Sequence, residues 1–238
     1  MATTDSEPIQ WRRDASTSRS VRLLWSLGVG TFFAAITIVV FWRLYDMARV
    51  TVGLAGQGIL VAVVGAIVVT ILAVAALGRP ERTAARLLGP LPIDPPEGRR
   101  LERAIDAALG AVAMASVMVA LMAIGRYVSQ HDLLAVGAGP FTGLTALFIP
   151  LALVALVLSS FLRSVGTLDR EERRIYLHQP DEVVDLDLIE DVSISRVGDA
   201  AVLKLEYAQP DGQYVPGPRR LVVPPAVARE IAGIVRST

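Results

Sequence analysis

Residues 50–78 read VTVGLAGQGILVAVVGAIVVTILAVAALG, a stretch that contains no Asp, Glu, Lys, Arg or His. A helix needs about 20 apolar residues to cross roughly 30 Å of hydrocarbon at about 1.5 Å per residue. Three further intervals are equally free of charge, and they run from Leu23 to Trp42, from Ala107 to Gly125 and from Leu133 to Leu162. We therefore expect four membrane-spanning helices, over about residues 22–43, 56–78, 104–127 and 140–162.

The composition agrees with a membrane protein. Of the 238 residues, 53% are hydrophobic, and the mean hydropathy is +0.52, which is too apolar for an ordinary water-soluble domain. The absence of cysteine excludes disulfides, thiolate catalysis and Cys-ligated zinc. Four arginines precede the first apolar interval, but this interval is longer than the apolar region of a signal peptide, and no A-x-A-like cleavage site follows promptly. We expect an uncleaved anchor.

Arginine counts in the connections predict the orientation of the spans. The N-terminal arm holds four arginines and the stretch from Arg79 to Asp106 holds six, whereas residues 43–49 hold two and residues 126–132 hold one. Short connections rich in Lys and Arg stay in the cytoplasm. We expect a multi-pass protein of the cell membrane with a disordered cytoplasmic arm (residues 1–20), a four-span domain (21–163) and both termini in the cytoplasm. An Arg/Pro-rich cytoplasmic loop (79–103) lies within the four-span domain, and Glu81–Leu88 is expected to form a short amphipathic helix in it.

The four charge-free intervals carry no Asp, Glu, Lys, Arg or His, which argues against an ion-coupled pump. They carry instead small residues at every fourth position, a spacing that lets membrane helices approach closely. These stripes are Gly58, Ala62, Ala66 and Thr70; Ala107, Ala111 and Ala115; and Gly139 with Gly143. Pro150 is expected to kink the fourth span and to free the carbonyl of Ala146, which a neighbour such as Thr145 would satisfy. Whether such a kink is a hinge or only a bend stays open.

After Arg163 the apolar residues alternate, which predicts strands. Strand-like runs cover residues 174–178, 183–188, 192–196, 201–207 and 219–223, and turn residues such as Gly198-Asp199 separate them. Pro225 then suits a helix start, and Val227, Ile231, Ile234 and Val235 make one apolar stripe. Residues 165–238 are therefore expected to form an α+β domain in which one helix covers an antiparallel sheet.

The order DREERRIYLHQ, VVDLDLIEDVSIS, AVLKLEY and RRLVVPP, followed by a helix, resembles a known type of module. It is similar to the short pleckstrin-homology-like (PH-like) domains that lie beside transmembrane helices in uncharacterised bacterial and archaeal membrane proteins. The nearest match to the phrase before their central hairpin is LDLIEDV, residues 186–192. The resemblance implies an antiparallel sheet or barrel with a C-terminal helix, and it brings no catalytic residue.

Asp185 and Asp187 are the most suggestive polar pair of the tail. Residues two apart on a strand share a face, so these carboxylates, with Glu190 and Asp191, could ligate a divalent metal. A solvated acidic face is favoured, because no glycine-rich phosphate loop is present. In this interpretation Val184, Leu186 and Leu188 face the core.

Other reactive residues lack partners at the spacing that catalysis needs. The two histidines, His131 and His178, are expected on opposite sides of the membrane. Ser159, Ser160 and Ser164 have no His or Lys at motif spacing. We expect no catalytic, cofactor or metal site.

These features predict an integral membrane protein without enzymatic activity that displays a PH-like domain to the cytoplasm for protein interaction or assembly. The expected partners are the lipid bilayer and either another protein or a second copy of the chain. Recognition of a lipid headgroup is disfavoured, because residues 164–238 hold 13 acidic against nine basic residues and Arg219-Arg220 is a nearly isolated basic pair. Nucleic acid is disfavoured because the chain is neutral overall. The alternative is a small oligomeric transporter or channel subunit.

Overall fold

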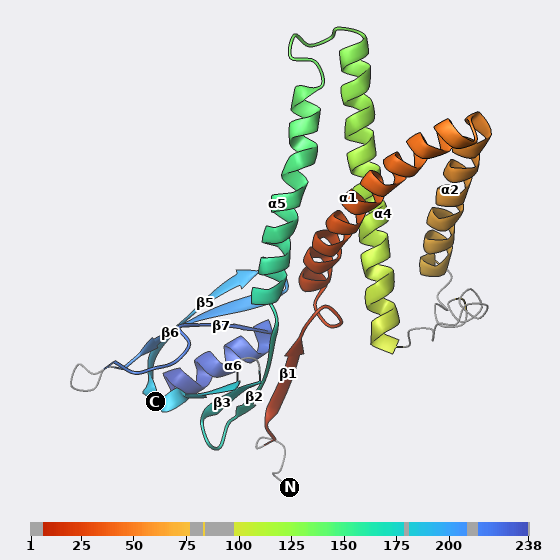
Figure 1. The fold of residues 1–238 in the computed structure, drawn as a ribbon. Coiled ribbons are helices and arrows are strands. Elements are labelled where there is room, and N and C mark those ends of the chain that lie inside the picture. Colours follow the sequence, from red (N-terminus) through yellow and green to blue (C-terminus); the bar gives the residue numbers. More distant parts are fainter. Residues whose placement is uncertain (1–6, 77–82, 84–97, 179–180, 209–213, 238) are drawn as a thin grey trace. The chain divides into compact units, whose positions relative to one another are not determined.

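The computed structural model of the chain describes residues 7–76, 83, 98–178, 181–208 and 214–237 (Figure 1). They form two compact units. One unit lies within Leu24–Leu156 and is helical. The other combines the described residues of Met1–Leu23 and Val157–Thr238, which are the two ends of the chain. Most of the expected loop 79–103, including the helix expected over Glu81–Leu88, lies outside the described residues.

Four long apolar helices agree with the four helices expected from the charge-free intervals. They are α1 (Arg19–Thr51), α2 (Leu54–Ala76), α4 (Gly98–Gln130) and α5 (Gly139–Phe161), and each is long and apolar enough to cross a membrane. The expected connection between the first two spans is wrong in one respect, because residues 43–49 continue helix α1. The chain turns only at Gly53, whose φ of 75° is left-handed. A helix of 33 residues is about 50 Å long, so α1 and α4 exceed the hydrocarbon thickness.

Glycines bring the helices of the membrane unit together. A Cβ on Gly30 would lie 2.3 Å from the backbone of Gly110, so only glycine permits this approach of α1 to α4. Nearby, the Ser26 hydroxyl donates to the carbonyl of Asp106 at 2.6 Å. On α5, the side chain of Leu156 fills the space beside Gly28, where a Cβ would meet it at 2.7 Å. Close backbone contact therefore joins α1 to both α4 and α5.

The predicted small-residue stripes fit this packing only in part. Ala107, Ala111 and Ala115 are half-buried beside the contact at Gly110, but Gly58, Ala62 and Ala66 are exposed, as are Gly139 and Gly143. The exposed positions therefore make no close helix contact within the described chain, and any role in contacts between copies stays a prediction.

Pro150 lies inside α5, which continues through it to Phe161. The Thr145 hydroxyl donates to the carbonyl of Phe141 at 2.9 Å, the residue four positions earlier. The expected bond from Thr145 to the carbonyl of Ala146 is therefore wrong.

The second unit is built from two antiparallel sheets and a helix. The first sheet has the order β1-β2-β3-β4, and the second has the order β5-β6-β7. The strands are β1 (Ile9–Arg13), β2 (Ser164–Asp169), β3 (Arg174–His178), β4 (Asp181–Asp185), β5 (Ile189–Val197), β6 (Ala200–Tyr207) and β7 (Arg220–Val223), and helix α6 covers Pro225–Arg236. We call this unit the module. Its antiparallel sheet and final helix agree with the expected α+β fold.

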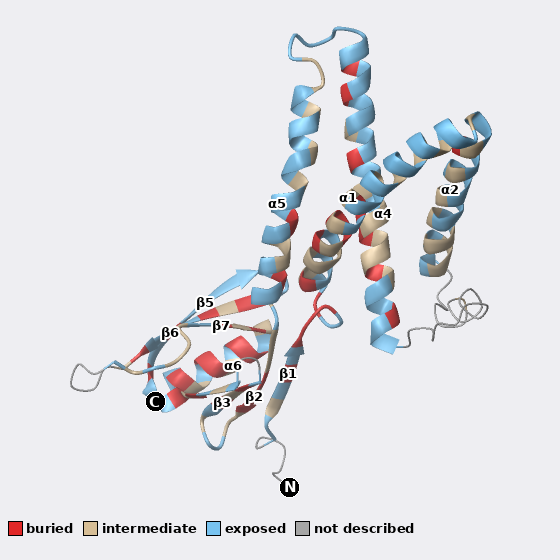
Figure 2. Cartoon of the chain, viewed as in Figure 1, coloured by how far each residue is buried: buried red, intermediate tan, exposed pale blue. Residues whose placement is uncertain are grey.

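One core holds the module together (Figure 2). Helix α6 buries Val227, Ala228, Ile231, Ala232 and Val235 in it. Alternate residues of the strands meet this face, because successive side chains of a strand point to opposite sides. The following residues are at most 2% exposed: Leu168, Ile175, Val184, Leu203, Leu205 and Val223.

The N-terminal arm is not disordered throughout, so the expectation for residues 1–20 is wrong. Strand β1 pairs with β2 in antiparallel register, with Trp11 opposite Gly166. The indole lies over this glycine so closely that a Cβ there would come within 2.6 Å of the ring. Trp11 is only 6% exposed, and its Nε1 donates to the Ser164 hydroxyl at 3.3 Å. A strand from before the first span therefore completes a sheet that follows the last span.

The segment from Val183 to Leu188 is not one strand. Strand β4 ends at Asp185, which caps a single 3-10 turn (Leu186–Leu188) by accepting a hydrogen bond from the backbone of Asp187. Asp185 and Asp187 therefore do not share a strand face. The turn buries Leu186 completely but leaves Leu188 40% exposed, so the expected core position of Leu188 is wrong. Asp side chains compete with the strand ladder in this way.

Trp11→Ala should loosen the β1–β2 pairing by about 3–5 kcal/mol, because it removes a large buried side chain and leaves a cavity over Gly166. Backbone hydrogen exchange of β1 and β2 in the full chain measures the change. Gln10→Ala, on the exposed side of the same strand, should stay within about 0.5 kcal/mol. Equal losses in both variants would contradict the packing role of Trp11.

Candidate functional site

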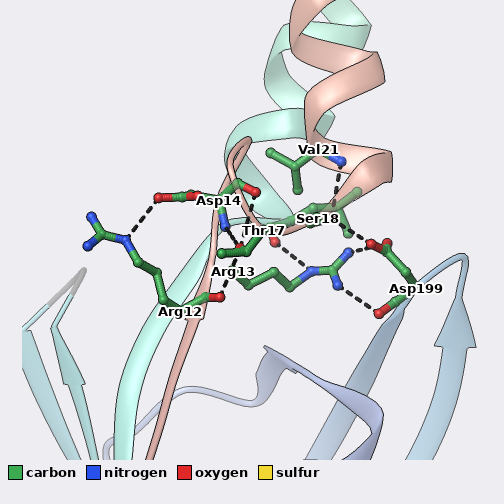
Figure 3. A network of polar contacts seen from close by, with 8 residues as sticks. Arg12, Arg13, Asp14, Thr17, Ser18, Val21 and Asp199 are labelled. Carbon is green, nitrogen blue, oxygen red and sulfur yellow. Dashed lines mark hydrogen bonds and ion pairs between the residues drawn. The ribbon is translucent and has the colours of Figure 1, made fainter. Parts of the chain in front are cut away.

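The end of β1, the turn that leads to α1 and the β5–β6 turn together form a dense polar cluster (Figure 3). We call the cluster of Arg12, Arg13, Asp14, Thr17, Ser18 and Asp199 the junction. Asp14 shapes its turn, since its carboxylate accepts from the backbone N–H of Ser16 at 2.8 Å and its carbonyl accepts from the N–H of Ser18 at 2.9 Å. The turn connects β1 to α1.

Arg13 is a buried cation at the centre of the junction. Its side chain is 5% exposed, and all three guanidinium nitrogens donate. Nε donates to the carbonyl of Leu162 at 3.1 Å, Nη1 to the carbonyl of Asp199 at 2.7 Å, and Nη2 to the Asp199 carboxylate at 2.6 Å. A buried charge is tolerated only when it is paired and hydrogen-bonded in this way. One side chain therefore joins β1, the residue after α5 and the β5–β6 turn.

Asp199 also holds the start of helix α1. Ser18 is placed as the N-cap of that helix, because its hydroxyl accepts from the N–H of Val21 at 3.3 Å. The same hydroxyl donates to the Asp199 carboxylate at 2.9 Å, which puts a negative charge beside the positive end of the helix dipole. Asp199 reaches this position from a tight turn in which Gly198 has a φ of 61°.

Both carboxylates of the junction are ionised at neutral pH. Burial alone would raise the pKa of Asp199, but hydrogen bonds from Arg13, Ser20 and Ser18 and the charge of Arg13 hold it well below its ordinary value of 3.8. Burial likewise opposes ionisation of Asp14, yet bonds from Ser16 and Arg12 lower its pKa to about 2. Neither group has the pKa of an acid or base that works near neutral pH. The junction is suited to holding elements together.

The histidines and serines singled out in the sequence do not assemble. His178 is exposed on β3, with its Nε2 at 3.4 Å from the Thr167 hydroxyl. His131 stacks on Tyr127 within α4 and the following turn, at 4.2 Å between ring centroids. Ser164 accepts the hydrogen bond from Trp11, and Ser159 is buried in the last turns of α5. Among the residues that the structure describes, these groups form no nucleophile with a base.

The two aspartates that the sequence offered as a metal pair lie beside arginines instead. Asp187 lies 2.5 Å from Arg173, and Asp185 lies 3.9 Å from Arg174. Within the described ranges, no three His, Asp or Glu side chains are arranged to hold a metal ion. Such exposed pairs contribute little to stability.

Arg219 is not isolated. Its guanidinium stacks at 4.6 Å from the ring centre of Tyr207 and at 5.1 Å from that of Tyr214. It lines a polar hollow of about 580 Å³ together with Glu190, Lys204 and Glu206. Lys204 is paired with Glu206 at 2.7 Å, so the hollow has no unbalanced positive charge for an anionic headgroup.

Sequence reasoning missed Arg13 and Asp199. Arg13 was counted only as one of the arginines that orient the first span, and Asp199 only as a turn residue. One signal was available: an aromatic residue beside alternating polar residues in IQWRR is a strand pattern, although a very short one. Nothing in a single sequence indicates which distant carboxylate an arginine meets.

Comparison with known proteins assigns no residue a role. No family model, curated protein or solved structure matches the chain.

Arg13→Gln and Asp199→Asn should behave non-additively, with a coupling of about 1–2 kcal/mol, since each removes the other's partner. Hydrogen exchange of the β1 and β2 amides in the two single variants and the double variant gives this value. Arg12→Gln is the matched control, because Arg12 is half-exposed and its ion pair with Asp14 contributes at most about 1 kcal/mol. If Arg12→Gln lowers the hydrogen-exchange stability of β1 and β2 as much as Arg13→Gln does, the buried arginine is not the residue that stabilises the junction.

Proposed function

We propose that the chain is a membrane protein without enzymatic activity that presents a PH-like module to the cytoplasm for protein interaction or assembly. One observation carries this proposal. The module includes the first residues of α1 and the last residues of α5, and Arg13 bonds both to the residue after α5 and to the turn that caps α1. The first residues of α1 and the last residues of α5 are therefore part of the module, as suits a platform that lies next to membrane helices in the chain.

The PH-like assignment is supported by the order of the elements. Two antiparallel sheets are followed by one C-terminal helix that covers their shared core, which is the form that the sequence resemblance implies. Strand β1 is an addition to that form, because it precedes the four long helices in the sequence and pairs with β2, which follows them.

The cytoplasmic orientation is supported by the arginines. Arg12, Arg13, Arg19 and Arg22 precede the first charge-free interval, and Arg99, Arg100 and Arg103 lie on the exposed or half-buried first turns of α4. Positive charge near helix ends favours the cytoplasmic side.

The docking surface of the module is proposed at strand β4. This strand ends the order of the first sheet, and a sheet edge has backbone groups that another chain can bind. Val183 is 55% exposed there, beside the acidic residues Asp181, Glu182 and Asp185. An apolar anchor within an acidic edge fits a partner segment that is basic at its rim.

The alternative function, a small oligomeric transporter or channel subunit, has one supporting observation. Gly58, Ala62 and Ala66 are exposed along α2 and are therefore free to contact another copy. The transporter alternative gives no reason for the N-terminal arm to contribute strand β1 to the module.

Val183→Arg should lower the recovery of a bound partner, or of a second tagged copy, by about tenfold when the full chain is purified from membranes. The matched control is Val197→Arg, a change of the same size at a 49% exposed position on the other sheet. It should leave recovery unchanged. If neither variant changes what co-purifies, β4 is not the docking surface, and solute flux through vesicles that hold the protein would then support the alternative.

A further inference from the structure

We propose that the membrane unit holds one acyl chain of an anionic phospholipid in a hollow between α1, α4 and α5. This site is separate from the module and goes beyond the proposed function. The hollow has a volume of about 470 Å³, which is within the range of about 300–1,000 Å³ of ligand pockets. All its lining residues belong to the membrane unit.

The walls of the hollow are almost entirely apolar. Helix α1 contributes Ala35, Ile38 and Val39, and α4 contributes Met118 and Met122. From α5 come Phe141, Ala146 and Ile149. Small residues widen the space, while the two methionines offer flexible surfaces that adapt to an irregular chain. Such walls match hydrocarbon and offer a polar ligand almost nothing to bind.

The two hydroxyls that line the hollow are already occupied by their own helix. Thr142 donates to the carbonyl of Ala138 at 3.1 Å, and Thr145 donates to that of Phe141 at 2.9 Å. Neither hydroxyl needs a ligand or a water to donate to. A hollow of this kind stays dry, and an empty one costs the packing contacts of its walls. In a membrane, the apolar molecule at hand to fill it is a lipid tail.

Arg126 determines which lipid is favoured. It lines the same hollow and is the first charged residue after the charge-free interval Ala107–Gly125, so it marks the end of the span where phosphates lie. Among the described residues, no carboxylate forms an ion pair with Arg126, and its side chain is exposed. The neighbouring Gly125 lets Phe141 pack against α4. A Cβ added to Gly125 would lie 3.0 Å from the Cβ of Phe141. Arg126 therefore lines the hollow as an exposed cation, and its charge is available to a headgroup.

The test is native mass spectrometry of the full chain released from vesicles of equal phosphatidylglycerol and phosphatidylethanolamine. The wild-type chain should retain one phospholipid, with phosphatidylglycerol in excess. Ala146→Phe fills the hollow and should lower the retained fraction about tenfold. Gly143→Phe is the matched control, because Gly143 lies on the same helix and a Cβ there meets nothing within 4 Å. It should retain lipid like the wild type.

Arg126→Gln leaves the hollow open and tests the headgroup separately. It should retain a lipid but lose about fivefold of the preference for phosphatidylglycerol, which corresponds to about 1 kcal/mol per basic residue at an anionic surface. Retention that is unchanged by Ala146→Phe, or reduced equally by Gly143→Phe, would overturn the acyl site. A preference that survives Arg126→Gln would overturn the assignment of an anionic lipid, as would a hollow that proves to be filled by a second copy of the chain.

Discussion

The pairing of strand β1 with β2 is the contact on which the rest of the module depends. Trp11 and Ser164 are 153 residues apart in the chain, yet they lie side by side in one sheet. The entropy lost in closing so long a loop grows only with the logarithm of its length, so distance in sequence is a small obstacle. What the pairing requires is a place for the indole, and Gly166 provides it.

The junction turns this pairing into a connection with the membrane. Five residues, 14–18, lead from β1 to α1, and residues 162–163 lead from α5 to β2. Arg13 bonds to Leu162 in the second connection and to Asp199 in the β5–β6 turn, and Asp199 accepts from Ser18 in the first connection. These bonds join the first sheet to the β5–β6 turn, to the start of α1 and to the residue after α5. This physical link is the reason for proposing an interaction platform.

The parts that local sequence predicts well are those whose signal is local. Uncharged apolar intervals predicted four helices, and alternation with turn residues predicted β3, β6, β7 and α6 nearly to the residue but only the middle of β5. Strand β1 was not predicted, because it has only five residues and is followed by Asp, Ser, Thr and Arg, a composition typical of a solvated arm. The 3-10 turn at Leu186 was not predicted, because the alternation of apolar residues there is equally compatible with a strand. The hydrogen bond from the backbone of Asp187 to the Asp185 side chain favours the turn. The junction could not be predicted, since it joins residues from three distant segments.

The closure of the module by β1 can be measured directly, since the chain has no cysteine to interfere. Gln10 and Thr167 are directly opposite in the register of β1 and β2. A chain with Gln10→Cys and Thr167→Cys should form a disulfide within one molecule under mild oxidation in native membranes, because opposed strand residues bring their Cβ atoms to about 4.5–5.5 Å. Gln10→Cys with Asp169→Cys, which lies two residues further along β2 than Thr167 and on the same face, should cross-link far less. Absence of the first cross-link, or its formation only between two copies, would contradict the account.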